Sequence, residues 1–367
     1  MPRPLFLCPF LTCTALVVLS GCAPVGPDHE VPTIELPASF SQGGMQWKRQ
    51  SPGQRPGPQS WWRLYHDATL TALVERALAR NQDLASSAAR LRQAREMSNV
   101  ARSRYFPDVN LGTSAERSKF RYRGPGDGAA VLSNDFSVPV DFRYELDVWG
   151  KVSRLVESAS ATEAAAGESL NALRLSVAGE VAQTYWALRA VDANRAVLTR
   201  TLEIRRKALA LLTKRHDVGN ISGLDLLRAE TEVATAEAER IGLDQNRVVL
   251  VNALAVLGGT VASGTAIAEQ TDLPKPPAVP LALPSEVLRQ RPDIRAAERR
   301  VAAANADIGV ASAAFYPSFS INASSGLEAS HLGDLFQTSA LVWSLGANAV
   351  MPITTSGPKR KAKNRAM

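Results

Sequence analysis

An internal repeat is the feature that most constrains the fold of this chain. The stretch that begins at Leu84 matches the stretch that begins at Ile294 without a gap, at a constant offset of 210 residues. The identical pairs are Asp83 and Asp293, Arg90 and Arg300, Ala94 and Ala304, Val100 and Val310, Ala101 and Ala311, Pro107 and Pro317, and Ser114 and Ser324. Because self-similarity at a fixed period marks a reused structural unit, both halves are expected to fold alike.

Each copy of the repeat begins with a helical pattern. In residues 294–315, small or apolar residues recur in alternating steps of three and four, and residues 84–105 follow the same seam. Such a stripe is typical of helices that pack as in a coiled coil. Both stripes end at an aromatic pair followed by Pro107 or Pro317. The residue before a proline is pushed out of the helical region, so each helix is expected to end there.

After each proline the apolar period changes from about 3.5 to 2, which predicts strands. The alternating apolar positions are Phe136, Val138, Val140, Phe142, Tyr144, Leu146 and Val148 in the first copy, and Leu341, Trp343, Leu345, Ala347, Ala349, Met351 and Ile353 in the second. Each copy therefore predicts helix, strand, loop and strand. The predicted strands cover residues 107–118, 134–148, 317–328 and 339–353, with a polar, Gly-rich loop over 119–135.

The apolar bands of these strands allow two interpretations. A band of about 10 alternating residues suits a transmembrane barrel strand, and it also suits a soluble β-hairpin packed on a layer of helices. Two hairpins supply four strands, whereas small barrels need about eight. Because a lipid-exposed sheet cannot keep an open edge, the transmembrane interpretation requires several chains that share one barrel.

A very long helical hairpin is predicted between the two pairs of strands. Residues 151–216 contain no proline, and their apolar side chains recur in steps of 3, 4 or 7. A second helix is predicted from Ser222, a suitable N-cap residue with Asp225 at the N3 position. The antiparallel hairpin over 151–257 is thus expected to have its tip near Gly219.

The first 22 residues predict export and a lipid anchor. Residues 1–21 contain one basic residue, an apolar run and a group of small residues, which is the pattern of a secretory signal peptide. The sequence Leu-Ser-Gly-Cys at 19–22 resembles the lipobox of bacterial lipoproteins, so Cys22 is the predicted acylation site. An ordinary signal peptide followed by a chance cysteine is the alternative. By resemblance to the lipoprotein sorting rule, Ala23 favours the outer membrane.

Composition and motif content argue against several other classes. The chain is 45% hydrophobic and 21% charged, which excludes a disordered chain. The net charge of +7 is concentrated in the last ten residues, so nucleic-acid binding loses its support. The four histidines are scattered, and no HExxH, GxSxG or P-loop motif is present. We therefore expect no enzyme activity, no catalytic residue, no metal site and no cofactor.

Several segments, in order, resemble the outer membrane factors, the TolC-like channel proteins, in their NodT-type lipoprotein branch from RND efflux systems. They include WWRLYHDATLTALVERALARNQDL, YELDVWGKV, RHDVGNISGLDLLRAE and LRQRPDIRAAERRVAAANADIGVASAAFYP. The resemblance covers residues 19 to about 357. It implies a mainly α fold with a β-barrel part, that is, a TolC-like α-helical barrel plus four transmembrane β-strands per chain. A trimer would then have a 12-stranded barrel.

The same resemblance implies a function and partners. It implies a homotrimeric channel in the bacterial outer membrane, with helices that extend into the periplasm. The channel would be a passive export duct for drugs or other small molecules, coupled to a periplasmic adaptor (membrane fusion protein) and an inner-membrane RND-type pump. The resemblance of the tip suggests adaptor contacts at Arg215, Val218, Gly219, Ile221, Ser222 and Leu226. Capping of the helix turn is an alternative role for these residues, and both roles can hold together.

The repeat and the N-terminal signal also divide the chain. The expected segments are a signal peptide over 1–21, a lipidated extended segment over 22–60, a first repeat over 61–270, an incomplete second repeat over 271–357 with a helix over 284–315, and an aberrant basic tail over 358–367. A second repeat of full length would extend beyond residue 367, so a second helical hairpin is not expected in this chain. The alternative function is therefore a non-transporting periplasmic coiled-coil lipoprotein or an inactive truncated product.

Overall fold

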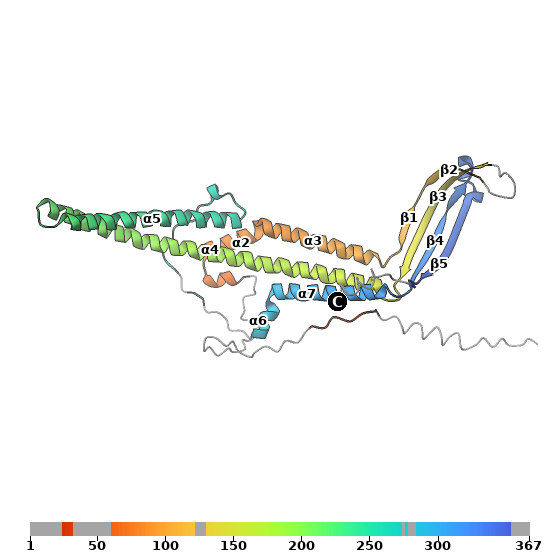
Figure 1. Ribbon diagram of the computed structural model, residues 1–367, viewed down its shortest axis with the longest axis horizontal. Helices are drawn as coiled ribbons and strands as arrows, with labels where there is room; N and C mark the ends of the chain where they lie inside the picture. Colours follow the sequence, from red (N-terminus) through yellow and green to blue (C-terminus); the bar gives the residue numbers. More distant parts are fainter. Residues whose placement is uncertain (1–23, 32–59, 122–129, 274–275, 278–283, 354–367) are drawn as a thin grey trace, which may run out of the picture. The chain divides into compact units, whose positions relative to one another are not determined.

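The computed structural model describes residues 24–31, 60–121, 130–273, 276–277 and 284–353. The chain divides into two compact units. Unit 1 comprises residues 1–33, 92–165 and 297–367, and unit 2 comprises residues 34–91 and 166–296. Three long helices have residues in both units, namely α3 (Gln82–Ser103), α4 (Lys151–Asp217) and α7 (Pro292–Ala313) (Figure 1).

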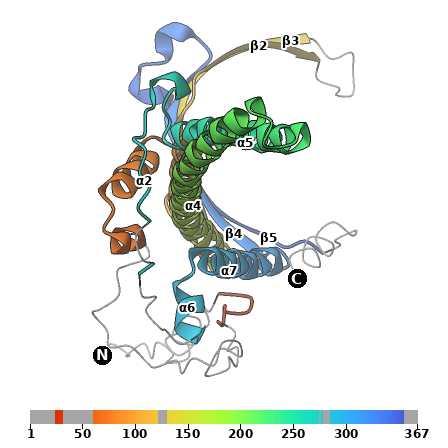
Figure 2. The ribbon, with the colours of Figure 1, turned by 90° about the vertical axis from the view of Figure 1, so that its left-hand side faces the viewer.

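Unit 1 contains one antiparallel sheet. Its strands are β1 (Asp108–Leu111), β2 (Ser114–Arg121), β3 (Ala130–Leu146), β4 (Ser318–Ala329) and β5 (Leu341–Val350). β1 and β2 pair with the same edge of β3 in one continuous register, so they act as one strand interrupted at Gly112 and Thr113. β3 pairs with β4, and β4 pairs with β5. Figure 2 shows that the strands form a curved layer.

The strands depart from the predicted bounds mainly at the first hairpin. β2 runs to Arg121 and β3 begins at Ala130, so most of the predicted loop over 119–135 is strand, and residues 122–129 lie outside the described residues. The predicted strand 107–118 is split into β1 and β2, while 134–148, 317–328 and 339–353 correspond to β3, β4 and β5. Charged residues such as Lys119 and Asp135 pair their backbones without an apolar alternation, which is why periodicity missed these extensions.

The single helix predicted over 284–315 is two helices in the structure. α6 spans Pro284–Gln290 and α7 begins at Pro292. Arg291 lies between them because a residue before proline avoids the helical region. Proline itself suits the first position of the following helix. The four 3₁₀ helices in the described residues are η1 (Trp61–Tyr65), η2 (Ala262–Gly264), η3 (Leu332–Asp334) and η4 (Thr338–Ala340).

In unit 1, α4 begins directly after the sheet and is capped by a carboxylate. The Asp147 side chain accepts hydrogen bonds from the backbone N–H groups of Val152 and Ser153 at 2.7 and 2.8 Å. These bonds satisfy donors that the first turn of a helix leaves free. Arg95 of α3 forms an ion pair with Glu163 of α4 at 3.2 Å, which holds the two helices side by side.

The hydrophobic core described for this chain lies in unit 2. It joins α2 (Ala68–Arg80) to the middle of α4 and to the end of α5 (Gly223–Leu257). Leu70, Val74, Tyr185 and Leu188 are fully buried there. The Tyr185 hydroxyl donates to the Asp67 carboxylate at 2.6 Å. Burial raises the pKa of Tyr185, and this hydrogen bond raises it further.

A buried ion network adjoins this core. The Asp192 side chain is completely buried and accepts from Arg189 at 3.0 Å and from Arg247 at 2.7 Å. Both arginines also donate to the segment that follows α5, at the carbonyl groups of Ala268 and Ile267, each at 2.7 Å. The network therefore ties α4, α5 and this segment together.

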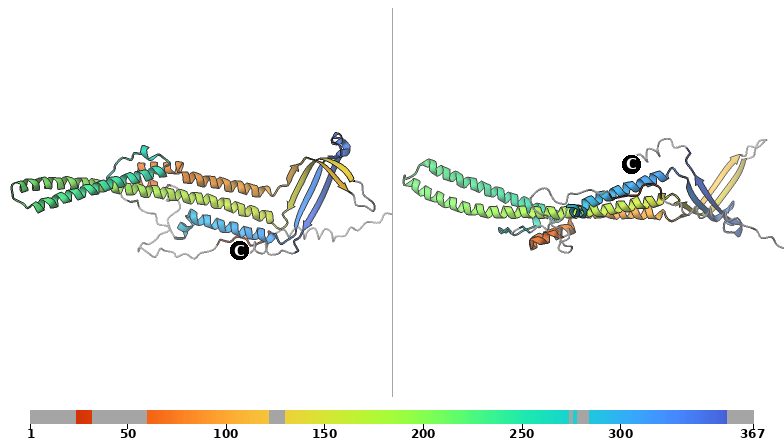
Figure 3. Two further views of the ribbon diagram at one scale, coloured as in Figure 1. Left: turned by 45° about the horizontal axis from the view of Figure 1, so that its top comes forward. Right: turned by 90° about the horizontal axis from the view of Figure 1, so that it is seen from below.

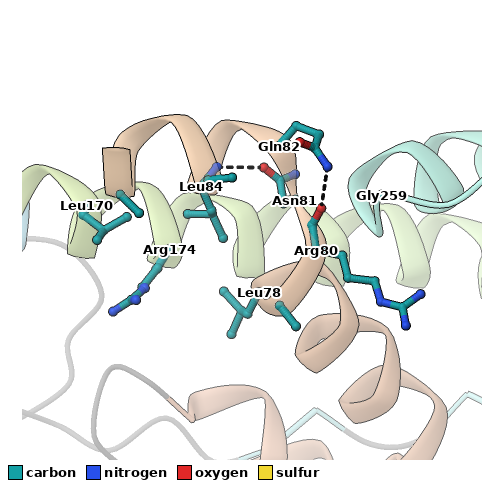
Figure 4. Close-up of a pocket in the computed structure, with 11 residues that line it drawn as sticks. Leu78, Arg80, Asn81, Gln82, Leu84, Leu170, Arg174 and Gly259 are labelled. Carbon is teal, nitrogen blue, oxygen red and sulfur yellow. Dashed lines mark hydrogen bonds between the residues drawn. The ribbon is translucent and has the colours of Figure 1, made fainter. Parts of the chain in front are cut away.

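A bend at Asn81 separates α2 from α3 and lines a small open pocket (Figure 4). The Asn81 Oδ1 atom accepts from the N–H groups of Asp83 and Leu84 at 2.9 and 3.2 Å, and its Nδ2 atom donates to the Leu257 carbonyl at 3.1 Å. The pocket has a volume of about 430 Å³ and includes Arg174 in its lining. Asn81 uses its polar atoms to cap α3 and to bond to the end of α5. We therefore assign this pocket a structural role, as the place where α2, α3 and α5 meet.

Candidate functional site

The sheet has one apolar face. Directly paired residues of an antiparallel ladder point to the same face. The register pairs Val140 with Ser325 and Ser325 with Trp343, and it pairs Phe142 with Ala323 and Ala323 with Leu345. The large apolar side chains on this face are Val109, Leu111, Leu132, Phe136, Val138, Val140, Phe142, Tyr144, Leu146, Phe319, Ile321, Leu327, Leu341, Trp343 and Leu345. At the far end of the first hairpin, the same face also carries Arg117, Lys119 and Arg121 of β2.

The opposite face of the sheet is polar. Most of its residues are polar or charged, namely Asp108, Asn110, Ser114, Asp135, Ser137, Asp141, Arg143, Glu145, Ser320, Asn322, Ser324, Glu328, Ser344 and Asn348; Phe120, Val131, Pro139, Val342 and Val350 are its larger apolar residues. Arg143 donates to the Asn322 side chain at 3.2 Å, and Ser114 and Ser137 share a hydrogen bond of 2.8 Å. Val138, Val140, Phe142 and Leu345 thus share one face, the face that a transmembrane strand would turn toward lipid, and Asp141 lies on the other.

The apolar face is uncovered and the sheet is open at both edges. Trp343 and Leu345 are 72% and 70% exposed. Among the described residues, neither the outer edge of β1 and β2 nor the outer edge of β5 pairs with a further strand. An exposed apolar patch of this kind marks a surface that contacts another protein or a membrane. The sheet is therefore incomplete in a single chain.

The turn between α4 and α5 is closed by local hydrogen bonds. The N–H of Gly219 donates to the His216 carbonyl and the N–H of Asn220 donates to the Arg215 carbonyl, both at 2.8 Å. This is the Schellman pattern, which places a residue of positive φ after the helix. Gly219 fills that place with a φ of +73°, and glycine adopts it without a Cβ clash.

Ser222 caps the second helix of the turn. Its Oγ atom accepts from the N–H of Asp225 at 3.3 Å and donates to the Asp225 carboxylate at 2.7 Å. Figure 3 shows α4 and α5 running side by side up to this turn in both of its views. The capping role expected for Ser222 is therefore confirmed.

The turn gathers the six predicted tip residues, and it adds two that the sequence reasoning missed. Arg215, Val218, Gly219 and Ser222 are exposed, whereas Ile221 and Leu226 are half-buried. Leu224 and Leu227, which were not predicted, are 58% and 60% exposed. A signal for them existed, because Leu224, Leu226 and Leu227 form a leucine cluster at the start of a helix otherwise rich in alanine and charge.

Other predicted features fall outside these two sites. Cys22 lies outside the described residues. In the part of the chain that the structure describes, no helix is both long enough and apolar enough to cross a membrane. The described residues also contain no group of three or more histidine, cysteine or acidic side chains arranged to hold a metal ion.

Known proteins share this combination of a two-faced sheet and a long helical hairpin. The family of outer membrane efflux proteins matches residues 73–260 and 283–366. A probable efflux pump outer membrane protein of Pseudomonas putida, SepC, is 30% identical over 357 residues, covering 96% of this chain and 74% of SepC. TtgC, a second such P. putida protein, is 31% identical over 345 residues, covering 93% of this chain and 70% of TtgC.

The solved structure of the outer-membrane channel OprN has the same fold. It superposes with a TM-score of 0.86 at 30% identity, over 94% of this chain and 76% of OprN. The chain belongs to the outer membrane efflux protein family. The resemblance to TolC-like channels is thereby confirmed: the chain has the TolC-like fold and is an efflux channel component of the outer membrane, with its helical part in the periplasm.

Proposed function

We propose that three copies of this chain form a passive export duct that works with a periplasmic adaptor and an inner-membrane RND-type pump. Each copy contributes four strands to a 12-stranded barrel, and the helices continue the duct through the periplasm. The substrates are drugs or other small molecules. No cofactor or catalytic group takes part, because a duct only has to exclude lipid and let solutes pass.

The observation that carries this proposal is the two-faced sheet with two open edges. Lipid cannot satisfy the N–H and C=O groups of a sheet edge, so a membrane-spanning sheet must close. Four strands are too few for closure, and copies of the chain supply the missing edges. The apolar face then contacts lipid and the polar face lines water. A coiled-coil scaffold without transport would have no use for such a face.

Val140 and Asp141 provide the test of the barrel, since they are neighbours on opposite faces of β3. Arginine on the lipid face near the bilayer midplane costs about 2–4 kcal/mol. Val140→Arg should therefore lower the amount of chain inserted in the outer membrane, measured in membrane fractions after urea extraction. Asp141→Arg is the matched control and should insert normally. Equal insertion of both variants would contradict the proposal that this face contacts lipid.

The proposal includes a lipid anchor at Cys22. The lipobox-like sequence at 19–22 supports it, and each buried CH₂ of an acyl chain contributes about 0.8 kcal/mol to membrane binding. Cys22→Ser should abolish incorporation of labelled palmitate and leave the signal peptide uncleaved. Palmitate labelling of the variant at the level of the parent would rule out acylation at this cysteine.

The proposal assigns adaptor binding to the hairpin tip. The exposed Val218, Leu224 and Leu227 support it, because the turn satisfies its own backbone bonds and leaves apolar side chains free for a partner. Leu227→Glu should weaken crosslinking to the adaptor at least tenfold without loss of the channel from the membrane. Val256→Glu, at the other end of α5, changes a side chain that is 71% exposed and serves as the control. Loss of crosslinking in both variants would contradict a specific tip contact.

A further inference from the structure

A short N-terminal segment is threaded between two helices of unit 1. Residues 24–28, called the strap below, lie along the start of α4 and the last turns of α7. The N–H of Val25 donates to the Trp149 carbonyl at 3.0 Å, and the Asn305 side chain donates to the Pro27 carbonyl at 2.8 Å. The strap is thus bonded to the turn that precedes α4 and to α7, and it forms no regular secondary structure itself.

Three glycines allow the strap to approach this closely. A Cβ atom on Gly150 would lie 2.6 Å from Pro24, and one on Gly26 would lie 2.6 Å from the Cα atom of Gly309. Gly26 and Gly150 also have φ angles of +108° and +70°, which other residues rarely adopt. A Cβ on Gly309 would lie 2.8 Å from the Val25 carbonyl oxygen. The surface on which the strap docks, called the seat below, comprises Trp149, Gly150, Arg154, Asn305 and Gly309. The strap fits the seat only while Gly26, Gly150 and Gly309 have no side chain.

Arg154 closes the seat from the α4 side. Its side chain is only 5% exposed, and its Nη2 atom donates to the Asp28 carboxylate at 2.7 Å and to the Gly26 carbonyl at 3.3 Å. Its Nη1 atom pairs with Glu157 of the same helix at 2.8 Å. A buried cation is costly unless it is paired and hydrogen-bonded. The docked strap supplies two of the acceptors of this guanidinium, the Asp28 carboxylate and the Gly26 carbonyl, so both bonds would break if the strap left.

The seat lies at the membrane-side end of α4. Pro24 contacts Gly150, and Gly150 follows Trp149, whose ring stacks on Tyr316 at 4.9 Å and donates to the Pro317 carbonyl at 2.7 Å. β3 ends at Leu146, the last residue of the apolar face on that strand. Cys22 precedes Pro24 by two residues, and two residues of chain reach about 7 Å at most.

We propose that the strap and Arg154 form a docking device that fixes the lipid anchor beside the end of the apolar sheet face. The proposal rests on acylation of Cys22, stated above as part of the proposed function. Arg154 is a positioning residue here, because it acts on the anchor only through the strap. The acyl chains and the sheet then enter the membrane as one unit. If the strap were undocked, the acyl chains could bind the membrane without holding the sheet next to it.

Gly309→Ala tests the seat with a change that favours the helix itself. Glycine is less favourable than alanine in a helix interior, so local propensity predicts a gain in stability. The new Cβ would lie 2.7 Å from Arg154 Cγ and should eject the strap. Gly242→Ala in α5 is the matched control, since its Cβ would meet no described atom within 4 Å apart from the neighbouring backbone of its own helix.

The main measurement is hydrogen exchange of the 24–31 peptide in the full-length protein. Gly309→Ala and Arg154→Ala should raise the exchange rate of the Val25 amide at least tenfold, and Gly242→Ala should leave it unchanged. Because Arg154 is buried, Asp28→Ala provides a milder variant: the Asp28 side chain is 89% exposed, and Arg154 keeps its pair with Glu157. It should raise exchange threefold or more. Unchanged protection in all three strap variants would overturn the proposal.

A second measurement separates the strap from acylation. Palmitate incorporation should be normal in Gly309→Ala and Asp28→Ala, while the outer-membrane fraction of each falls at least twofold relative to Gly242→Ala. If the parent itself took up no palmitate, the anchor at Cys22 would fail, while the exchange data would still report whether the strap docks. Normal palmitate uptake and normal insertion with a released strap would overturn the proposed role of docking.

Discussion

The α4–α5 hairpin is held in two different ways along its length. Near Asp192, the two helices are joined by side chains that are far apart in the sequence, such as Asp192 of α4 and Arg247 of α5. Tyr185 and Leu188 are fully buried there, and Arg189 pairs with Asp192. At the tip, the bonds that shape the turn connect residues at most five apart, and Val218 is 68% exposed. The first region depends on the rest of unit 2, whereas the second keeps its shape alone.

This difference shows how one hairpin combines a fixed base with an adaptable end. A turn that satisfies its own backbone groups can present apolar side chains without unfolding, because no core has to be broken to free them. Between the two regions, α4 and α5 are linked by surface ion pairs, such as Arg206 with Glu237 at 2.6 Å. Exposed pairs of this type contribute little to stability.

The largest effect is expected from breaking the buried network at the base. Asp192→Ala would leave two guanidinium groups, Arg189 and Arg247, without their shared carboxylate. Loss of one partner from a buried ion pair costs about 3–5 kcal/mol. Denaturant unfolding of the purified protein in detergent should show this loss. Glu237→Ala, which breaks an exposed pair, is the control. A similar cost for both variants would contradict the difference between the base of the hairpin, near Asp192, and its shaft, the stretch between Asp192 and the tip.

The next effect is expected from the core. Leu188→Ala should lower the free energy of unfolding by about 2–5 kcal/mol, since it removes a fully buried side chain and leaves a cavity. Leu211→Ala changes the same residue type in the same helix where it is 53% exposed, and it should cost much less. If the two variants proved equally unstable in the assembled protein, Leu211 would be covered by another chain.

A smaller and strictly local effect is expected at the tip. Ser222→Ala removes the side-chain cap of α5 and should cost about 1 kcal/mol. Exchange of the Asp225 amide should rise severalfold, while amides near Asp192 keep their protection. Thr231→Ala, in the same helix but away from its end, should leave the Asp225 amide unaffected. Loss of protection near Asp192 in Ser222→Ala would show that tip and base open together.

The smallest effect is expected from the surface pairs of the shaft. Arg206→Ala breaks an ion pair whose side chains are 58% and 42% exposed. The free energy of unfolding should fall by no more than about 1 kcal/mol, and the difference from the parent should shrink at high salt because ions screen exposed charges. A loss that persists in 1 M salt would mean that Arg206 contributes through packing.

The sequence was sufficient to predict the features that depend on local pattern. The long run without proline predicted the hairpin over 151–257, and the residues around Gly219 and Ser222 predicted its turn and its cap. The period-2 alternation also placed Val140 and Asp141 on opposite faces of the sheet. Each of these features is set by residues close together in the chain, so a single sequence is enough to find it.

Other features depend on contacts that no local pattern encodes. The pairing of Asp192 with Arg247 joins residues 55 positions apart, and both read as ordinary polar positions on helices. The strap read as an irregular, proline-rich segment because its order comes entirely from α4 and α7. The break at Pro292 is different, since the rule that ended the helix before Pro317 applies equally there. The stripe itself begins at Ile294, after this proline, but the helix predicted over 284–315 includes residues on the N-terminal side of Pro292 that form the separate helix α6.

The open edges of the sheet also have a consequence for the life of the chain before assembly. An unpaired strand edge is a template for pairing with any other chain, and the apolar face beside it adds a second adhesive surface. Such a subunit is safest when it is rare and spends little time alone between export and membrane entry. Aggregation grows with the concentration of species that expose such surfaces. When synthesis is faster than assembly, unassembled chains should accumulate and aggregate through the same edges that pair in the barrel. The unpaired edges of β1, β2 and β5 therefore limit the expression level at which the chain assembles without aggregating.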